Sequence, residues 1–195
     1  MQGDDKLQKL LILKRFLPVI IPFVSIFFII IIVLMVCTSS SGDSTVLAGT
    51  FFKKPFKDDV NYMITSEFGN RRDPFNQEVI KFHTGIDLSA PDGTAILSIG
   101  DGIVTETGNN PAGFGNYVYI KHNYKGKIYY SIYGHLLDKS IRVSEEQRVK
   151  AGDVIGIIGT TGNSTGVHLH LTLMSPIFSF ESKYLVDPKY VIEGL

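Results

Sequence analysis

The stretch STGVHLHL, residues 164–171, places two histidines two positions apart in a chain that has only five. Its alternating pattern predicts a β-strand over residues 168–174, in which successive side chains point to opposite faces. His168 and His170 then share one face, while the leucines between and after them cover the core on the other. Two imidazoles side by side on one strand face indicate a metal, proton-transfer or substrate site, because buried polar groups need partners.

Short β-prone runs surround this stretch and are separated by glycine-rich turns such as PDG, GDG, YKGK and TTGNSTG. Such turn signals between short apolar runs mark strand ends. Many short strands with few helices predict a mostly β domain, built as an antiparallel β sandwich or barrel-like fold. The strands are expected at residues 94–99, 102–107, 116–122, 127–133, 154–158 and 168–174.

Length, charge and cysteine content restrict the class of protein. The chain has 195 residues, no net formal charge and one cysteine. The length suits one domain with accessory segments. The balanced charge gives no basic excess for binding phosphates, so no nucleic-acid partner is expected. A single cysteine excludes an intramolecular disulfide.

An uncharged run, FLPVIIPFVSIFFIIIIVLMVC, occupies residues 16–37. Its length is sufficient for a transmembrane helix, which needs about 20 apolar residues. A cleavable signal peptide is the main alternative, but its apolar region is normally only about 7–15 residues long. A lipoprotein signal ending at Cys37 is disfavoured because Val36 is larger than the small residue expected there. We therefore expect a retained membrane anchor.

The basic residues flanking this run predict its orientation. Four of them precede it, and none follows it until Lys53. Positive residues favour the cytoplasmic side of a membrane, so the C-terminal part is expected outside the cytoplasm. The expected organisation is a cytoplasmic segment (1–15), a transmembrane anchor (16–37), a flexible Ser/Thr/Gly-rich linker (38–55) and an extracytoplasmic domain (56–195).

Histidine and aspartate side chains at three places suggest a zinc site. His83 and Asp87 stand four residues apart in FHTGIDLSAPDGT, and His135 stands in YGHL. A catalytic zinc ion needs three protein ligands and one open position. His83, Asp87 and one of the paired histidines meet that need, which leaves the other and His135 free to transfer protons or bind an oxyanion. The residues alone thus predict a zinc hydrolase. His122 has no acidic or histidine neighbour in sequence, which favours a structural role.

The order of FHTGIDLSAPDGT, YGHL and KAGDVIGIIGTTGNSTGVHLH closely resembles the lysostaphin/LytM-type zinc metallopeptidases, which cut peptidoglycan peptides. The resemblance runs over residues 64–186. It implies the duplicated hybrid motif type of fold and Zn²⁺ bound by His83, Asp87 and His170. It also implies that His135 and His168 act as catalytic residues on the water and on the tetrahedral intermediate.

The expected function is that of a membrane-anchored zinc endopeptidase acting on peptidoglycan at the cell-wall side of a bacterial cell membrane. The first alternative is a non-catalytic peptidoglycan-binding or activator module of the same fold, but such proteins typically lack one or more metal-site residues. The second is a lipoyl or biotinyl carrier or a sugar-phosphotransferase domain, which RVKAGDVIGIIG also resembles. Such a protein needs a lysine at a hairpin tip or a phosphorylatable histidine, and a cytoplasmic location. The third is a structural tether that only holds peptidoglycan. Protein partners are not indicated.

One position departs from the family pattern. Relatives usually follow HLH with an aromatic or aliphatic residue and then glutamate, whereas this chain has Leu171 and Thr172. Thr172 would share the strand face of His168 and His170, so we expect its hydroxyl to replace part of a contact to the histidines.

Overall fold

The central strand of the fold is β11 (Leu169–Met174), which carries the second histidine of the pair. It pairs antiparallel with β4 (Gly85–Ser89) on one side and β8 (Lys127–Leu136) on the other. These strands belong to an eight-stranded sheet in the order β1-β4-β11-β8-β7-β6-β9, with β12 also paired to β11. The remaining bounds are β1 (Met63–Ser66), β7 (Gly115–Tyr124), β6 (Gly102–Asn110), β9 (Arg148–Val149) and β12 (Leu185–Val186).

Alternation along β11 separates the core from the functional face. Leu169, Leu171 and Leu173 are fully buried and belong to the hydrophobic core cluster. His170 and Thr172 point to the opposite face, as a period of two requires. The predicted division of this strand into a core face and a polar face is therefore confirmed.

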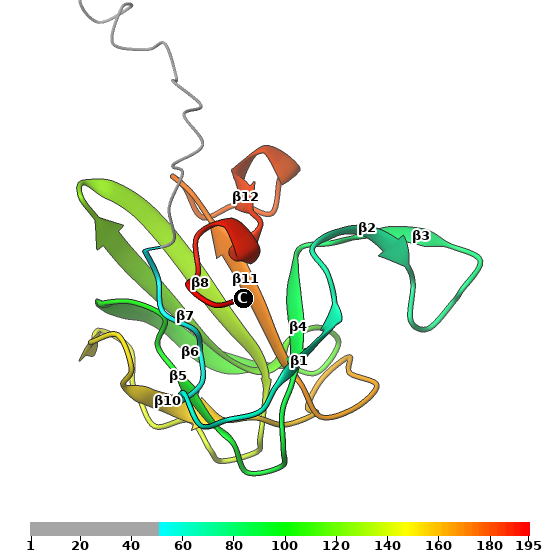
Figure 1. Cartoon of the computed structure of the whole chain (residues 1–195), viewed down its shortest axis with the longest axis horizontal. Helices are drawn as coiled ribbons and strands as arrows, with labels where there is room; N and C mark the ends of the chain where they lie inside the picture. Colours follow the sequence, from blue (N-terminus) through cyan, green and yellow to red (C-terminus); the bar gives the residue numbers. More distant parts are fainter. Residues whose placement is uncertain (1–50) are drawn as a thin grey trace, which may run out of the picture. The chain divides into compact units, whose positions relative to one another are not determined.

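Two small sheets flank the large one (Figure 1). Strands β5 (Ala95–Leu97) and β10 (Val154–Ile157) form one of them. Strands β2 (Gly69–Arg72) and β3 (Ile80–His83) form a hairpin that stands out from the rest of the domain. Two short 3₁₀ helices, η1 (Ser182–Tyr184) and η2 (Pro188–Tyr190), lie near the C-terminus. Every named strand pair is antiparallel, which confirms the mostly β, antiparallel prediction.

The computed structural model describes residues 51–195. The predicted cytoplasmic segment, the anchor and most of the linker lie outside the described residues. Within residues 51–195, no helix is both long enough and apolar enough to cross a membrane. Phe52, which the sequence places in the linker, is 4% exposed and packs in the core, so the packed domain begins before residue 56.

Each of the six predicted strands corresponds to an observed one, with ends shifted by a few residues. The strands between residues 63 and 89 were not predicted, although they carry part of the site. His168 lies just before β11, in an isolated bridge to Gly159, and still belongs to the extended segment that the sequence indicated.

Gly85 allows β4 and β11 to approach each other. A Cβ at this position would lie 2.4 Å from the Leu171 carbonyl oxygen and 2.8 Å from the Thr172 hydroxyl. Contacts under 3.0 Å with backbone do not occur for real side chains, so only glycine fits without moving the strand. The close approach places Asp87 directly opposite His170 in the register.

Candidate metal centre

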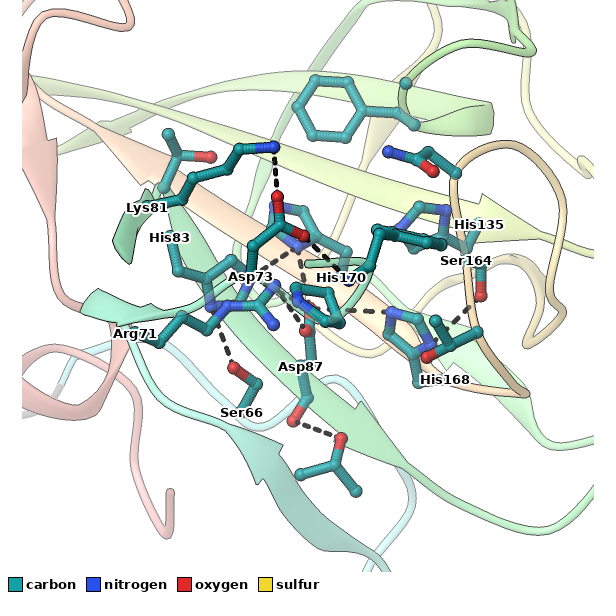
Figure 2. A pocket seen from close by; sticks show the side chains of 18 of the residues that line it. Ser66, Arg71, Asp73, Lys81, His83, Asp87, His135, Ser164, His168 and His170 are labelled. Atoms are coloured by element: carbon teal, nitrogen blue, oxygen red, sulfur yellow. Dashed lines mark hydrogen bonds and ion pairs between the residues drawn. The ribbon is translucent and has the colours of Figure 1, made fainter. Parts of the chain in front are cut away.

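Three potential ligand atoms converge from neighbouring strands (Figure 2). His83 ends β3, Asp87 lies in β4 and His170 lies in β11. The Asp87 Oδ1 atom is 2.8 Å from His170 Nδ1 and 3.1 Å from His83 Nε2, and the two nitrogens are 3.1 Å apart. All three side chains are buried. The sheet register therefore assembles a compact group of two nitrogens and one oxygen.

In His83 and His170, the ring nitrogen that points away from the other candidate ligands, here called the outer nitrogen, has a hydrogen-bond partner of its own. His83 Nδ1 is 2.8 Å from the Glu67 carbonyl oxygen, to which it donates. His170 Nε2 is 2.9 Å from the Thr172 hydroxyl. Each outer nitrogen can carry the proton of its ring, so that on metal binding His83 Nε2 and His170 Nδ1 would present lone pairs to the ion. Outer partners of this kind orient metal-binding histidines.

The two oxygens of Asp87 have different surroundings. Oδ1 faces the imidazoles, whereas Oδ2 lies 3.5 Å from the Arg71 guanidinium. Burial favours the neutral acid, but hydrogen bonds from His170 and His83 outweigh it and hold the Asp87 pKa well below its usual range. Asp87 is therefore a carboxylate, the form that binds a metal ion.

His135 and His168 lie beside the three candidate ligands, with ring centroids 4.7 Å apart. His135 Nδ1 donates to the Thr161 carbonyl oxygen at 2.8 Å, and His168 Nδ1 donates to the Gly166 carbonyl oxygen at 2.8 Å. The Nε2 atom of His168 is 3.7 Å from Asp87 Oδ1. In each ring, the hydrogen bond of Nδ1 leaves Nε2 free to act next to the ligand group.

His135 adopts a left-handed backbone conformation, with φ of 63°. Non-glycine residues rarely adopt this conformation, although histidine does so more readily than most. Strained positions of this kind cluster at active sites and cost roughly 1–3 kcal/mol. Burial lowers the pKa of His135 to about 4, so its imidazole is neutral near pH 7.

The five residues line one cavity of about 380 Å³. Its size lies within the usual range for ligand sites of about 300–1,000 Å³. The β2–β3 hairpin contributes Arg71 and Lys81, and Lys81 forms an ion pair with Asp73. Phe114 lies on the wall, 5.3 Å from the His170 ring.

The donor set fits zinc. Zinc binds histidine nitrogen and carboxylate oxygen at about 2.0–2.2 Å, and tetrahedral geometry then sets its ligands roughly 3.3 Å apart. The three atoms here, 2.8–3.1 Å from each other, need only a small outward shift. Three protein ligands leave a fourth position open toward the cavity, as in catalytic rather than structural zinc sites.

The structure brings all five predicted site residues together and leaves the fifth histidine elsewhere. His122 is enclosed by the β7–β8 hairpin, where it bonds the Asp101 carbonyl and the Ser131 hydroxyl. The expected contact of Thr172 is made to His170. Arg71 and Phe114 were not predicted. Nothing in the local sequence pairs either of them with a residue of the site.

Comparisons with known proteins agree with this arrangement. Residues 81–186 match peptidase family M23. The chain is 40% identical over 135 residues to the peptidoglycan DD-endopeptidase ShyA of Vibrio cholerae, covering 69% of this chain and 29% of ShyA. It is 41% identical over 107 residues to the DD-carboxypeptidase/endopeptidase Mpg of Neisseria meningitidis, covering 55% and 23%. The chain thus spans less than a third of these curated relatives.

Solved structures of peptidases also resemble this chain, and the similarity covers most of the length of the two that follow. The catalytic domain of lysostaphin from Staphylococcus simulans superposes with a TM-score of 0.57 at 32% identity, covering 66% of this chain and 90% of that one. LytU superposes with a TM-score of 0.55 at 35% identity, covering 72% and 89%. The chain belongs to peptidase family M23.

Proposed function

We propose that this protein is a zinc endopeptidase that hydrolyses peptide bonds in the stem peptides or cross-bridges of peptidoglycan. The observation that carries the proposal is the convergence of His83, Asp87 and His170 on one point, with the imidazoles of His135 and His168 beside it. The relative ShyA is a peptidoglycan DD-endopeptidase, which supports peptidoglycan as the substrate.

His83, Asp87 and His170 would hold the zinc ion, which when bound would supply a Lewis acid for the scissile carbonyl and lower the pKa of a water to about 7. His135 and His168 are placed to accept a proton from a water in the cavity, since each ring bonds a backbone carbonyl through Nδ1 and has Nε2 available for the transfer. Once protonated, either imidazole becomes a donor at both nitrogens. It can then stabilise the oxyanion or return the proton to the leaving amine.

A non-catalytic binding module is the second candidate, and the site geometry disfavours it. The orientations of four imidazoles are set by three backbone carbonyls and one hydroxyl, so that each ring directs its other nitrogen toward the ligand group or the cavity. A module that only binds peptidoglycan has no need for this arrangement, and still less for a strained backbone at His135.

Zymography with the purified full-length chain on peptidoglycan tests the proposal. Clearing is expected in zinc, loss of clearing in a chelator, and recovery when zinc is restored. The His170→Ala variant should give none. Clearing that survives both the chelator and the substitution rejects the zinc mechanism, and a zinc-loaded protein without any clearing supports the non-catalytic module.

We also infer that residues 16–37 anchor the protein in the bacterial cell membrane, with the peptidase domain on the wall side. The uncharged run and the basic residues before it support this orientation. Protease added to cells with a permeabilised cell wall and an intact cell membrane should remove an epitope placed after Leu195. An epitope placed before Met1 should be protected. The reverse pattern rejects the orientation, and a soluble, shortened product rejects the retained anchor.

A further inference from the structure

The sheet face that carries the metal centre continues beyond it. The register places Thr172 opposite Ile132, and Ile132 opposite Tyr119. Residues opposite each other in antiparallel strands share a face, and Thr172 shares its face with His170. Strands β11, β8 and β7 thus form a continuous surface from the metal centre to Tyr119.

Aromatic side chains cover this surface in an unbroken series, which we call the aromatic strip. Phe114 packs on His170 with ring centroids 5.3 Å apart and stacks on Phe180 at 5.9 Å. Phe180 contacts Phe178 at 6.0 Å, and Phe178 contacts Tyr119 at 5.3 Å. The strip consists of Phe114, Tyr117, Tyr119, Tyr130, Phe178 and Phe180.

The outer part of the strip is open to solvent. Ile177, Phe178 and Phe180 are 47%, 42% and 44% exposed, and they follow one another within four residues of the loop after β11. Isolated exposed apolar residues are normal, but contiguous ones mark binding surfaces. The loop is held on the sheet face, because Phe178 also contacts Tyr130 at 5.6 Å.

Phe114 joins the strip to the catalytic cavity, since it lines that cavity and touches Phe180. Gly134, which lies directly opposite His170, leaves room for the Phe114 ring. A Cβ at position 134 would lie 3.2 Å from the Phe114 ring, which is closer than ordinary van der Waals contact. A substrate held at the metal centre and extending past Phe114 would therefore lie on the strip.

The chemistry of the strip differs from that of the cavity. Charged side chains line the cavity, where Arg71 lies beside Asp87 and Lys81 pairs with Asp73. The strip presents uncharged ring faces with a hydrogen-bonding group at its margin, where the Tyr117 hydroxyl donates to Glu106 at 2.5 Å. One acidic and one basic residue lie next to the strip, with Glu106 opposite Tyr119 and Lys121 opposite Tyr130, so their charges cancel.

We propose that the aromatic strip binds the glycan part of peptidoglycan while the cavity holds the peptide to be cut. A pyranose ring has an apolar C–H face that stacks on an aromatic ring and hydroxyl groups at its edge, which suits flat rings with polar groups beside them. The proposal rests on the proposed function, because it takes the occupant to be the substrate of the metal centre.

The test compares two substrates that contain the same scissile bond: a cross-linked muropeptide dimer with its disaccharides, and the same peptide dimer without sugars. Phe178→Leu and Phe180→Leu, made in the full-length chain, keep an apolar side chain but remove the flat ring. Each should lower kcat/KM on the glycan-bearing dimer by about 5- to 10-fold, the size of one aromatic stacking contact. Neither should change kcat/KM on the sugar-free dimer.

Tyr190→Leu is the matched control, because Tyr190 is 68% exposed and lies outside both the strip and the cavity. It should leave both substrates unaffected. An equal loss on both substrates for the strip variants would show that the strip binds peptide, and no loss on either would show that it binds nothing. Both results overturn the proposal.

A binding measurement separates this proposal from the proposed function. Co-sedimentation with peptide-free glycan strands does not require hydrolysis. The wild-type chain and His170→Ala should bind the strands equally, and the double variant Phe178→Leu/Phe180→Leu should bind them several-fold more weakly. If no peptide is cut but this difference is found, only the catalytic proposal fails. If peptide is cut and the strands do not bind, only the glycan proposal fails.

Discussion

His122 and His135 are both buried, and burial lowers the pKa of each to about 4, yet they differ in what their nitrogens face. Both nitrogens of His122 are occupied, Nδ1 by the Asp101 carbonyl at 2.9 Å and Nε2 by the Ser131 hydroxyl at 2.7 Å. His135 uses only Nδ1 for a backbone carbonyl. Burial and pKa therefore do not separate a structural histidine from a functional one in this protein, whereas a lone pair directed at a shared cavity does.

The largest expected effect comes from His170→Ala, which removes a proposed metal ligand from the histidines that face the cavity. Zinc binding should be lost, and hydrolysis should fall by more than about 1,000-fold, since removing one member of a catalytic unit disables the whole. Metal content after dialysis and initial rates on a peptide dimer measure both quantities. Retention of one zinc per chain would assign the metal to other ligands.

His135→Ala and His168→Ala test whether these two histidines act in catalysis without binding the metal ion. Each should reduce kcat by about 10²- to 10⁴-fold, the usual contribution of general acid–base catalysis. Zinc content should remain at the wild-type value, because neither ring belongs to the converging triad. A loss of zinc in either variant would contradict this division.

The pH dependence of the free energy of unfolding tests the structural role of His122. Its folded pKa of about 4 lies below the ordinary value of 6.5, so the native state favours the neutral ring. The resulting stability is fully present above about pH 6.5 and is lost as the pH falls from there to about 4, by up to roughly 3 kcal/mol. His122→Gln keeps a donor and an acceptor but does not titrate, so its free energy of unfolding should vary less over this range.

Urea denaturation of both proteins between pH 4 and 7 measures the difference. Both are kept in a chelator, so that the cavity histidines titrate alike in the two proteins and cancel. Parallel curves for wild type and variant would mean that His122 contributes nothing to the acid sensitivity. Zinc affinity at pH 7 should be the same in both.

The smallest expected effect concerns Thr172, the partner of the outer nitrogen of His170. Thr172→Val has nearly the same shape but accepts no hydrogen bond from His170 Nε2. Zinc affinity should fall by about 10- to 100-fold, as for other partners of metal-binding histidines, while Thr172→Ser should retain it. Competition with a fluorescent chelator gives the affinities. Equal affinity in all three proteins would show that β11 alone orients the imidazole.

The spacing of residues along the chain was sufficient to find His83, Asp87 and the paired histidines, whereas the choice of His170 as the ligand came from the family resemblance. His168 and His170 could be placed on one face because a strand alternates, and His83 with Asp87 stood out as a short histidine–carboxylate segment. The predicted strands around them were found because each is a short apolar run between glycine-rich turns. Strands β1, β2 and β3 have only four residues each, and seven of these twelve residues are exposed, while only Ile86 and Leu88 are apolar in β4, so none of the four carries an apolar run that would indicate a strand.

The sequence by itself determined which side chains are available for the chemistry and that one strand face carries two of them. Only the tertiary structure decided which nitrogen of each histidine faces the cavity, because the partners are backbone carbonyls of Glu67, Thr161 and Gly166, which every residue type has. It also decided that Arg71 reaches Asp87 and that Phe114 joins the cavity to the aromatic strip. These contacts link residues far apart in the chain, and their positions follow from strand register rather than from any local pattern.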